Sequence, residues 1–171
     1  MNNNEYLANL LGAFATTISM RVEHEVSELG GHGLTHESAL VAIFNHPNDS
    51  IDVLRKVLGI THSGAVRLIN TLEQEGLVER HRSEKDARTA VLRVTPEGQQ
   101  RACKVLQARA QVTTQILETL TTEQQQTLTL LLETALGQLT NDKDDARRIC
   151  RLCNEKVCRA RGCPVEMSVS N

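Results

Sequence analysis

Four cysteines crowd together near the C-terminal end of the 171-residue chain. Gaps of two, four and four residues separate Cys150, Cys153, Cys158 and Cys163. Thiolate sulfur binds borderline and soft metal ions, and four neighbouring thiolates can complete a tetrahedral zinc site. The spacing therefore predicts a structural zinc site made by these four residues.

Other interpretations of this segment stay open. The spacing resembles that of a zinc knuckle, but the aromatic residue and the glycine of that motif are missing. An iron–sulfur cluster also takes four thiolates, and the Cys163-Pro164 ending is similar to that of some ferredoxin motifs, whose spacing differs. Basic residues around the cysteines would lower the thiol pKa values, which favours a redox switch. A disordered basic tail without function is the remaining alternative.

A second group of polar side chains suits duplex DNA. It begins where a helix is expected to start after a tight turn, and it consists of Thr61, His62, Ser63, Arg67 and Asn70. A helix fits the major groove, where Arg pairs with guanine, Asn pairs with adenine, and Ser or Thr reaches bases or phosphates. The N-terminus of a helix also favours a phosphate group. These five residues are therefore the predicted base-reading set.

A charged loop follows, between two short segments of alternating apolar residues. Arg82, Lys85 and Arg88 lie around the expected tip of this hairpin, and their side chains can reach phosphates or a narrow minor groove. Asp86 is expected to orient Arg88 through an ion pair. The alternative is a solvated face on a protein-interaction domain. The coincidence of helix, hairpin and charge favours DNA binding.

The elements that must position these side chains follow from the apolar periodicity. Thr35 is expected to cap the second helix, and Cys103 is expected to be a small core residue on the fifth. The apolar residues of the last long helix are expected to face inward. Helices are predicted over about 5–29, 35–46, 50–58, 61–75, 95–120 and 121–139, and strands over 77–82 and 89–94. The predicted fold class is mainly α with a small β-hairpin wing, a winged helix-turn-helix domain with long dimerisation helices.

Three regions follow from this pattern. Residues 1–34 and 95–140 are expected to form a helical dimerisation region, residues 35–94 the winged helix-turn-helix DNA-binding domain, and residues 141–171 a cysteine-rich basic segment. The long C-terminal helices carry more apolar positions than a small domain can cover, which predicts a homodimer. The net charge of −2 is uneven, because residues 1–49 carry −5 and residues 143–171 carry +3.

Composition excludes several classes of protein. Hydrophobic residues at 40% and charged residues at 23% indicate neither a disordered chain nor a membrane protein. The first residues lack the basic start of a secretory signal, so a cytoplasmic protein with reduced cysteines and no membrane partner is expected. The sequence contains no glycine-rich phosphate loop, nucleophile elbow or HExxH motif, so an enzyme is not expected.

The order of elements and several short motifs resemble the MarR family of bacterial transcription regulators. The most specific signal is the Asp-x-Arg wing at 86–88, followed by the Thr-Pro-x-Gly run at 95–98. The resembling stretches are 50–54, 58–61, 66–72, 75–80, 86–88 and 92–98. The cysteine segment lies beyond them and looks like an appended module.

The resemblance implies a homodimer joined through the first helix and the last two long helices. It also implies a pseudo-palindromic double-stranded DNA operator, usually a repressor function, and release by a small-molecule ligand or an oxidant. The wing arginine of the family reaches the minor groove, and that role falls on Arg88. Two other functions stay open: a redox- or metal-handling protein, and a protein-interaction module that uses the same fold.

Overall fold

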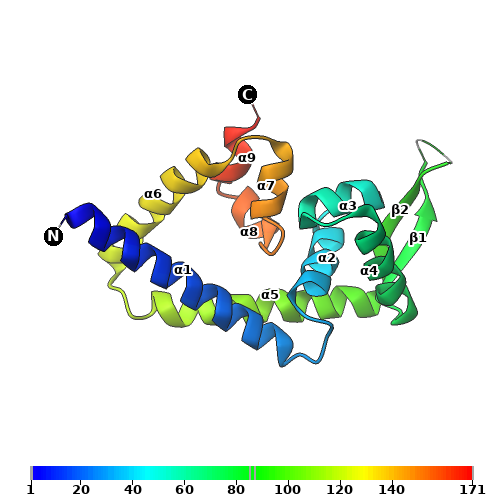
Figure 1. Ribbon diagram of the computed structural model, residues 1–171, viewed down its shortest axis with the longest axis horizontal. Helices are drawn as coiled ribbons and strands as arrows, with labels where there is room; N and C mark the ends of the chain where they lie inside the picture. The colour runs from blue at the N-terminus through cyan, green and yellow to red at the C-terminus, as the bar shows by residue number, and fades with distance from the viewer. Residues whose placement is uncertain (1, 85, 87, 171) are drawn as a thin grey trace.

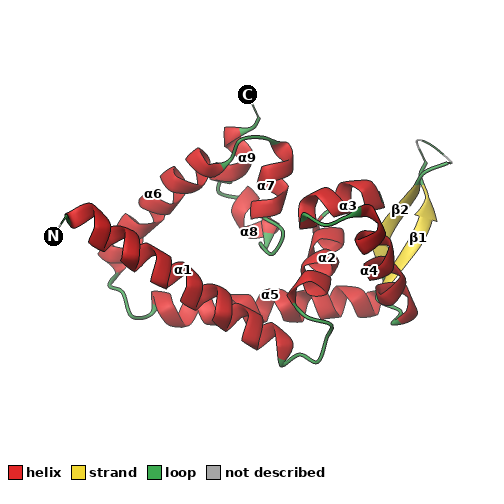
Figure 2. Ribbon diagram, viewed as in Figure 1, coloured by secondary structure: helices red, strands yellow, loops and turns green. Residues whose placement is uncertain are grey.

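The computed structural model describes residues 2–84, 86 and 88–170, and it is mainly helical with one antiparallel hairpin (Figure 1; Figure 2). The predicted fold class, mainly α with a β-hairpin wing, is therefore confirmed. In chain order the elements are α1 (Asn3–Ser27), α2 (Leu34–Asn45), α3 (Ile51–Leu58), α4 (His62–Gln74), β1 (Val78–Arg82), β2 (Ala90–Val94), α5 (Pro96–Leu117), α6 (Thr122–Leu139), α7 (Lys143–Ile149), α8 (Glu155–Arg159) and α9 (Pro164–Ser168).

Polar caps determine where most of the long helices begin. Ser50 caps α3, Thr61 caps α4 and Thr121 caps α6, each accepting a hydrogen bond from the backbone N–H three residues later. The predicted cap at Thr35 is wrong. The second helix starts earlier, after Gly33, whose φ of 95° is one that side-chain-bearing residues rarely adopt. Glycine therefore sets this helix start without a side-chain cap.

The main core lies where α1, α2 and α5 meet the helix-turn-helix pair. Leu40 and Ile43 of α2, Ile69 of α4 and Leu92 of β2 are fully buried there. Figure 1 shows α5 running along α1 and continuing beneath α2 and α4. One long helix thus supports both the winged-helix elements and the N-terminal helix.

A buried ion pair ties α2 to α5 inside this core. Arg101 donates from Nη2 to Glu37 Oε1 at 2.6 Å and from Nε to both carboxylate oxygens at 3.1 Å. Its Nη1 donates to the carbonyl of Leu29. A Cβ at Gly31 would collide with Glu37 Oε1 and Arg101 Nη2, so a larger residue there would require the side chains of this pair to shift. The network fixes the turn between α1 and α2.

The hairpin is anchored where it joins α5. The register pairs Val78 with Val94 and runs to Arg82 opposite Ala90. Thr95 caps α5 by accepting from the Gly98 N–H at 3.0 Å, and its hydroxyl donates to the Gly76 carbonyl at 2.6 Å. Thr95 therefore joins the turn after α4 to the start of α5 and positions the hairpin.

Apolar side chains on α1 and α6 remain uncovered. No residue of α6 within the described chain is buried, and Leu131 and Leu139 are 63% and 66% exposed. The expectation that the apolar residues of α6 face inward is therefore not met within the single chain. The exposed large hydrophobic residues of these two helices are Tyr6, Leu7, Leu10, Leu11, Phe14, Met20, Leu130, Leu131, Leu132 and Leu139. Cys103 on α5 is also exposed, which corrects its placement in the core.

The segment after α6 folds into three short helices, α7 to α9, here called the C-terminal module (residues 141–170). It has a small core of its own, made by Ala146, Cys163 and Val165 with Leu136 of α6 packed against it. Figure 1 shows the module lying between α6 and the pair α2 and α3. The alternative of a disordered tail does not describe this segment. None of the helices in the described ranges is long and apolar enough to cross a membrane.

Candidate nucleic-acid interface and cysteine pocket

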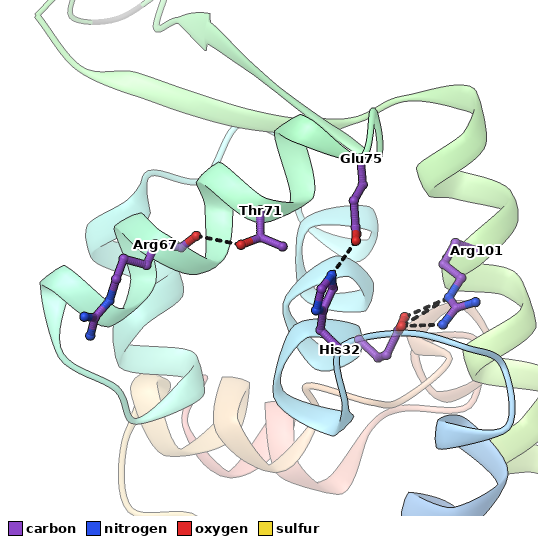
Figure 3. A network of polar contacts seen from close by, with 6 residues as sticks. His32, Arg67, Thr71, Glu75 and Arg101 are labelled. Atoms are coloured by element: carbon purple, nitrogen blue, oxygen red, sulfur yellow. Dashed lines mark hydrogen bonds and ion pairs between the residues drawn. The ribbon is translucent and has the colours of Figure 1, made fainter.

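The N-terminal half of α4 presents the predicted base-reading residues to solvent. Thr61, His62, Ser63 and Arg67 are all exposed. The Thr61 hydroxyl also caps the helix and lies 3.3 Å from the Ser63 hydroxyl. Figure 3 shows the Arg67 guanidinium extending away from the other residues drawn, while its carbonyl accepts from Thr71 at 3.2 Å. The structure therefore leaves these side chains accessible on one end of the helix.

Asn70, the fifth residue of the predicted set, has an intramolecular partner. Its side-chain oxygen accepts a hydrogen bond from Arg80 Nη2 at 2.8 Å, and Arg80 is also paired with Glu73. This contact ties β1 to the recognition helix and leaves the amide N–H groups of Asn70 as donors. Arg80 was not among the predicted site residues, because the residues next to it in the strand do not indicate which side chain it will contact.

Asp86 shapes the wing by hydrogen bonds to its turn, and not by the expected ion pair with Arg88. Its carboxylate accepts from the Arg88 backbone N–H at 3.0 Å and from the Thr89 hydroxyl at 2.9 Å. These two hydrogen bonds hold the pKa of Asp86 below its usual value. Among the contacts described for Asp86, an ion pair with the Arg88 guanidinium is not found, so that expectation is wrong. The carboxylate closes the turn by binding backbone, and the Arg88 side chain is exposed.

Arg82 is exposed at the end of β1. Lys85, which was predicted to contact DNA, lies outside the described residues. Arg93 on β2 donates to the side chain of Asn48 at 2.7 Å, which joins the hairpin to the loop before α3. The exposed arginines Arg82 and Arg88 thus lie on opposite sides of the hairpin tip, in the same domain as α4.

A polar network supports the C-terminal end of α4. His32 in the turn before α2 contacts the Glu75 carboxylate, and Figure 3 shows this pair on the side of α2 that also faces Arg101. Arg101 forms the ion pair with Glu37. The His36 ring lies 5.1 Å from that of His32. Burial and the nearby His32 lower the pKa of His36. The network links the recognition helix to the turn that follows α1.

The predicted metal ligands line one cavity of about 90 Å³. Cys150 follows α7, Cys153 lies in the next turn, Cys158 is on α8, and Cys163 precedes α9. The three short helices therefore bring all four thiols to one place. Other lining residues are His46, Ala146, Arg147, Glu155, Arg159, Val165 and Glu166.

The thiols of the pocket have unequal pKa values. The hydrogen bond from the Cys150 thiol lowers the pKa of Cys153 to about 6, against the effect of burial and with help from Arg109 and Arg151. The same contact and burial raise the pKa of Cys150. Burial, together with the neighbouring Cys153, raises the pKa of Cys158. The pair of Cys150 and Cys153 thus holds one thiolate near neutral pH, and the thiolate is the form that binds metals.

The cavity also touches the winged-helix domain, which the sequence analysis did not anticipate. His46, at the end of α2, lies 2.7 Å from Glu155 Oε1 and lines the pocket. Asn45 donates from Nδ2 to the Cys153 carbonyl at 3.0 Å, and Arg147 forms an ion pair with Asp49. Residues about a hundred positions apart cannot be paired from local sequence spacing, so only the tertiary structure reveals these contacts.

Comparison with known proteins points to one family. Residues 34–89 match the MarR family. The chain is 29% identical over 90 residues to the uncharacterized HTH-type transcriptional regulator YwhA of Bacillus subtilis (strain 168). It is 35% identical over 69 residues to a putative transcriptional regulatory protein for the hcr operon of Thauera aromatica. These matches cover 53% and 40% of this chain, and 65% and 42% of the relatives, so each spans less than two thirds of the relative.

A solved structure shares the fold. Wild-type MarR from E. coli, in its apo form, superposes with a TM-score of 0.64 at 22% identity, over 76% of this chain and 96% of that one. The family match covers the helix-turn-helix and the first part of the wing, and the shared fold extends over the long helices as well. Residues 34–89 are therefore similar to the MarR family, and the chain shares the fold of a MarR structure over most of its length.

Proposed function

We propose that this chain is a transcription regulator that binds a pseudo-palindromic duplex operator as a homodimer, most simply as a repressor. The family and the fold are those of transcription regulators and not of enzymes. The observation that carries the proposal is the exposed N-terminal end of α4, with Thr61, His62, Ser63 and Arg67 accessible. A helix presented in this way fits the major groove and places its first turns against the base edges.

The wing supports the same conclusion. Arg82 and Arg88 are exposed on the hairpin, and Asp86 and Thr89 hold the turn that carries Arg88. A long cation at this position reaches phosphates or a narrow minor groove beside the site read by α4. The contact of Arg80 with Asn70 and Glu73 ties the hairpin to the recognition helix, so the two elements would engage DNA as one body.

The uncovered apolar faces of α1 and α6 support the homodimer. Leu7, Leu11, Leu131 and Leu139 are each at least 60% exposed in the single chain. A second copy of the chain would cover these residues, because the same helices on the partner offer the same apolar surface. A two-fold dimer would then present two α4 helices about 34–36 Å apart, one turn of duplex DNA.

The test is a duplex selected by the wild-type protein from a randomised pool. Binding to the selected duplex and to a scrambled one is measured by fluorescence anisotropy at several salt concentrations. Arg67→Ala is expected to cost about 1–3 kcal/mol on the selected duplex and to relax the sequence preference. Arg88→Ala is expected to weaken binding to both duplexes and to reduce the salt slope by about one.

Lys104→Ala is the matched control, because it removes an exposed cation from α5, outside the winged-helix domain. It should leave affinity and salt slope unchanged. Failure of the selection to enrich any sequence, or binding that does not respond to salt, would overturn the proposal. A monomer in sedimentation analysis at the concentration used for binding would overturn the homodimer.

A signal for this regulator would enter through the C-terminal module. The four cysteines line one pocket beside the winged-helix domain, which favours a metal-, cluster- or redox-dependent response over an inert tail. A zinc ion, an iron–sulfur cluster and reversible thiol oxidation are the candidates carried by this donor set. A small-molecule or oxidant inducer remains part of the proposal, and no residue assigns a ligand.

A further inference from the structure

The four thiols of the cysteine pocket are not arranged evenly. The Cys150 thiol is in hydrogen-bond contact with Cys153 and with Cys163. Among the interactions described for Cys158, those with the other thiols are electrostatic. Four ligands of one metal ion are placed equivalently around it, whereas two thiols in contact are placed to bond to each other. The arrangement therefore singles out Cys150 as one member of a reactive pair.

The backbone selects Cys153 as the partner of Cys150. The Cys153 N–H donates to the Cys150 carbonyl at 2.8 Å, which closes a turn over residues 150–153. The first and last Cα atoms of such a turn lie within about 7 Å of each other, and a disulfide joins Cα atoms that are about 4.4–6.8 Å apart. Cys163 instead precedes α9, so a bond to it would tie two separate helices together. A bond between Cys150 and Cys153 needs only side-chain rotation and a small adjustment of one turn.

The pair can also be reached by a small molecule. Cys150 and Cys153 are half-buried and line the pocket, whereas Cys163 is buried. Oxidation of cysteine depends on the exposure of the sulfur, and a resolving cysteine next to the attacked one converts the first product into a disulfide. The two half-buried thiols of the turn are therefore the expected point of attack, and each has its resolving partner in contact with it.

We propose that Cys150 and Cys153 are a dithiol that a peroxide oxidises to an intramolecular disulfide. One sulfur of the pair attacks an oxygen of the peroxide, the O–O bond breaks, and a sulfenic acid forms while the departing oxygen takes up the thiol proton. The second sulfur attacks the sulfenic sulfur, so the S–S bond forms and the S–O bond breaks. The hydroxyl group leaves as water with the second thiol proton. Two electrons pass from the two sulfurs to one peroxide molecule, and a thiol reductant reverses the change.

The turn that carries the pair is docked on the winged-helix domain. Leu152, between the two cysteines, packs against the main core. The Cys153 carbonyl accepts from Asn45 Nδ2 at 3.0 Å, at the end of α2. A disulfide holds its two sulfurs about 2.05 Å apart, closer than two thiols in contact, so oxidation pulls the two ends of the turn together. Oxidation therefore changes the contacts of the module at the end of α2, next to the helix-turn-helix.

The first experiment identifies the bond and does not depend on DNA binding. The full chain is purified without oxygen, its zinc and iron are measured, and it is treated with equimolar hydrogen peroxide. The remaining thiols are alkylated before digestion with trypsin and mass spectrometry. Cleavage after lysine and arginine places the five cysteines on five different peptides, so each pairing has its own mass. The expected product joins peptides 149–151 and 152–156, and a thiol reductant restores both thiols.

Cys103 serves as the internal control of this experiment, because it is an exposed thiol on α5. It should stay reduced at the dose of peroxide that oxidises the pair, so the wild type alone carries the measurement. Cys158→Ser should form the same disulfide. A disulfide to Cys158 or Cys163, oxidation of Cys103 to the same extent, or no reaction of the pair overturns the proposal. A stoichiometric metal that protects the pocket thiols from the peroxide overturns it as well.

The second experiment tests the link to DNA, and this step rests on the proposed function. Affinity for the selected duplex is compared between reduced and oxidised protein, and a change of about 5- to 150-fold is expected. Cys150→Ser should show no such change after peroxide, and Asn45→Ala should form the disulfide but show a smaller change. Equal affinities of the two wild-type forms overturn the coupling while leaving the disulfide in place. If neither form binds DNA, the proposed function fails and the peptide masses still decide the disulfide.

Discussion

The winged-helix domain and the C-terminal module lie side by side and are stabilised in different ways. The domain is built on a continuous aliphatic core, in which Leu40, Ile69 and Leu92 are fully buried. The module buries only Ala146, Cys163 and Val165 among its described apolar residues, and it reaches the domain mainly through polar contacts. A region with a large core folds on hydrophobic burial alone, whereas a small one needs a further constraint such as metal ligation. The comparison identifies the module as the region with less hydrophobic burial to stabilise it.

The largest difference in the free energy of unfolding is expected between substitutions of Arg101 and Arg147. Arg101→Met leaves the carboxylate of Glu37, which is 6% exposed, without its partner, and this should lower the free energy of unfolding by about 3–5 kcal/mol. Arg147→Met breaks the partly exposed pair with Asp49 and should change the main unfolding transition by about 1 kcal/mol or less. Urea unfolding followed by circular dichroism measures both. Similar losses for the two variants would contradict the contrast between the regions.

Core truncation gives a second contrast. Leu40→Ala should cost about 2–5 kcal/mol in the main transition, because it opens a cavity in a fully packed core. Val165→Ala removes less volume, and each lost methylene equivalent should cost about 0.8 kcal/mol of stability. The small core that contains Val165 is expected to open separately from the main core. Hydrogen exchange should therefore rise only in α7 to α9 for Val165→Ala. A matched fall of the whole chain's stability would show that the two regions unfold together.

Helix caps offer a smaller test of the same kind. Ser50→Ala removes the hydroxyl that accepts from the Val53 N–H, and about 0.5–2 kcal/mol should be lost from the main transition. Asp142 caps α7, because its Oδ1 accepts a hydrogen bond from the Asp145 N–H at 2.8 Å. Asp142→Ala removes this cap. Its effect should be confined to hydrogen exchange in the module. Thermal unfolding of both variants, with exchange measured by mass spectrometry, separates the two effects.

The smallest expected effect depends on pH. Burial and the neighbouring His32 lower the pKa of His36 from 6.5, while Glu75 and Glu37 oppose them. The folded state therefore binds this proton less readily than the unfolded state. The stability that His36 contributes to the folded state is fully present above pH 6.5. It is lost as the pH falls from 6.5 through the lower pKa of His36 in the folded state.

His36→Gln should make the free energy of unfolding less dependent on pH just below 6.5. The effect should appear in the winged-helix domain and leave hydrogen exchange in the C-terminal module unchanged. A pH dependence identical to that of the wild type would show that His36 does not titrate differently on folding.

Local rules explain how much of the fold could be predicted. The caps at Ser50, Thr61 and Thr121 and the left-handed glycines at 59 and 76 are properties of a few neighbouring residues, so the sequence predicts them directly. Thr35 was predicted wrongly because a positive-φ glycine upstream set the helix start instead. The position of Cys103 was wrong because periodicity alone does not say which neighbours cover a helix face.

The candidate sites divide in the same way. The polar residues that open α4 and the basic residues of the wing follow from helix and turn signals, and their role in DNA binding stays a prediction. The bond between Asn70 and Arg80, and the backbone contacts of Asp86, depend on how the hairpin folds over α4. Side-chain partners across elements are selected by packing, which residue type and spacing do not encode locally.

The sequence by itself determined the element order, the winged helix-turn-helix pattern and the set of four clustered thiols, because periodicity, caps and cysteine spacing are local properties. Only the tertiary structure decided that these thiols line one cavity, that His46 also lines it, and that Asn45 binds the Cys153 carbonyl. Those contacts join residues about a hundred positions apart. They exist because α5 and α6 bring the C-terminal module back onto α2 and α3, where packing and not sequence distance selects the partners.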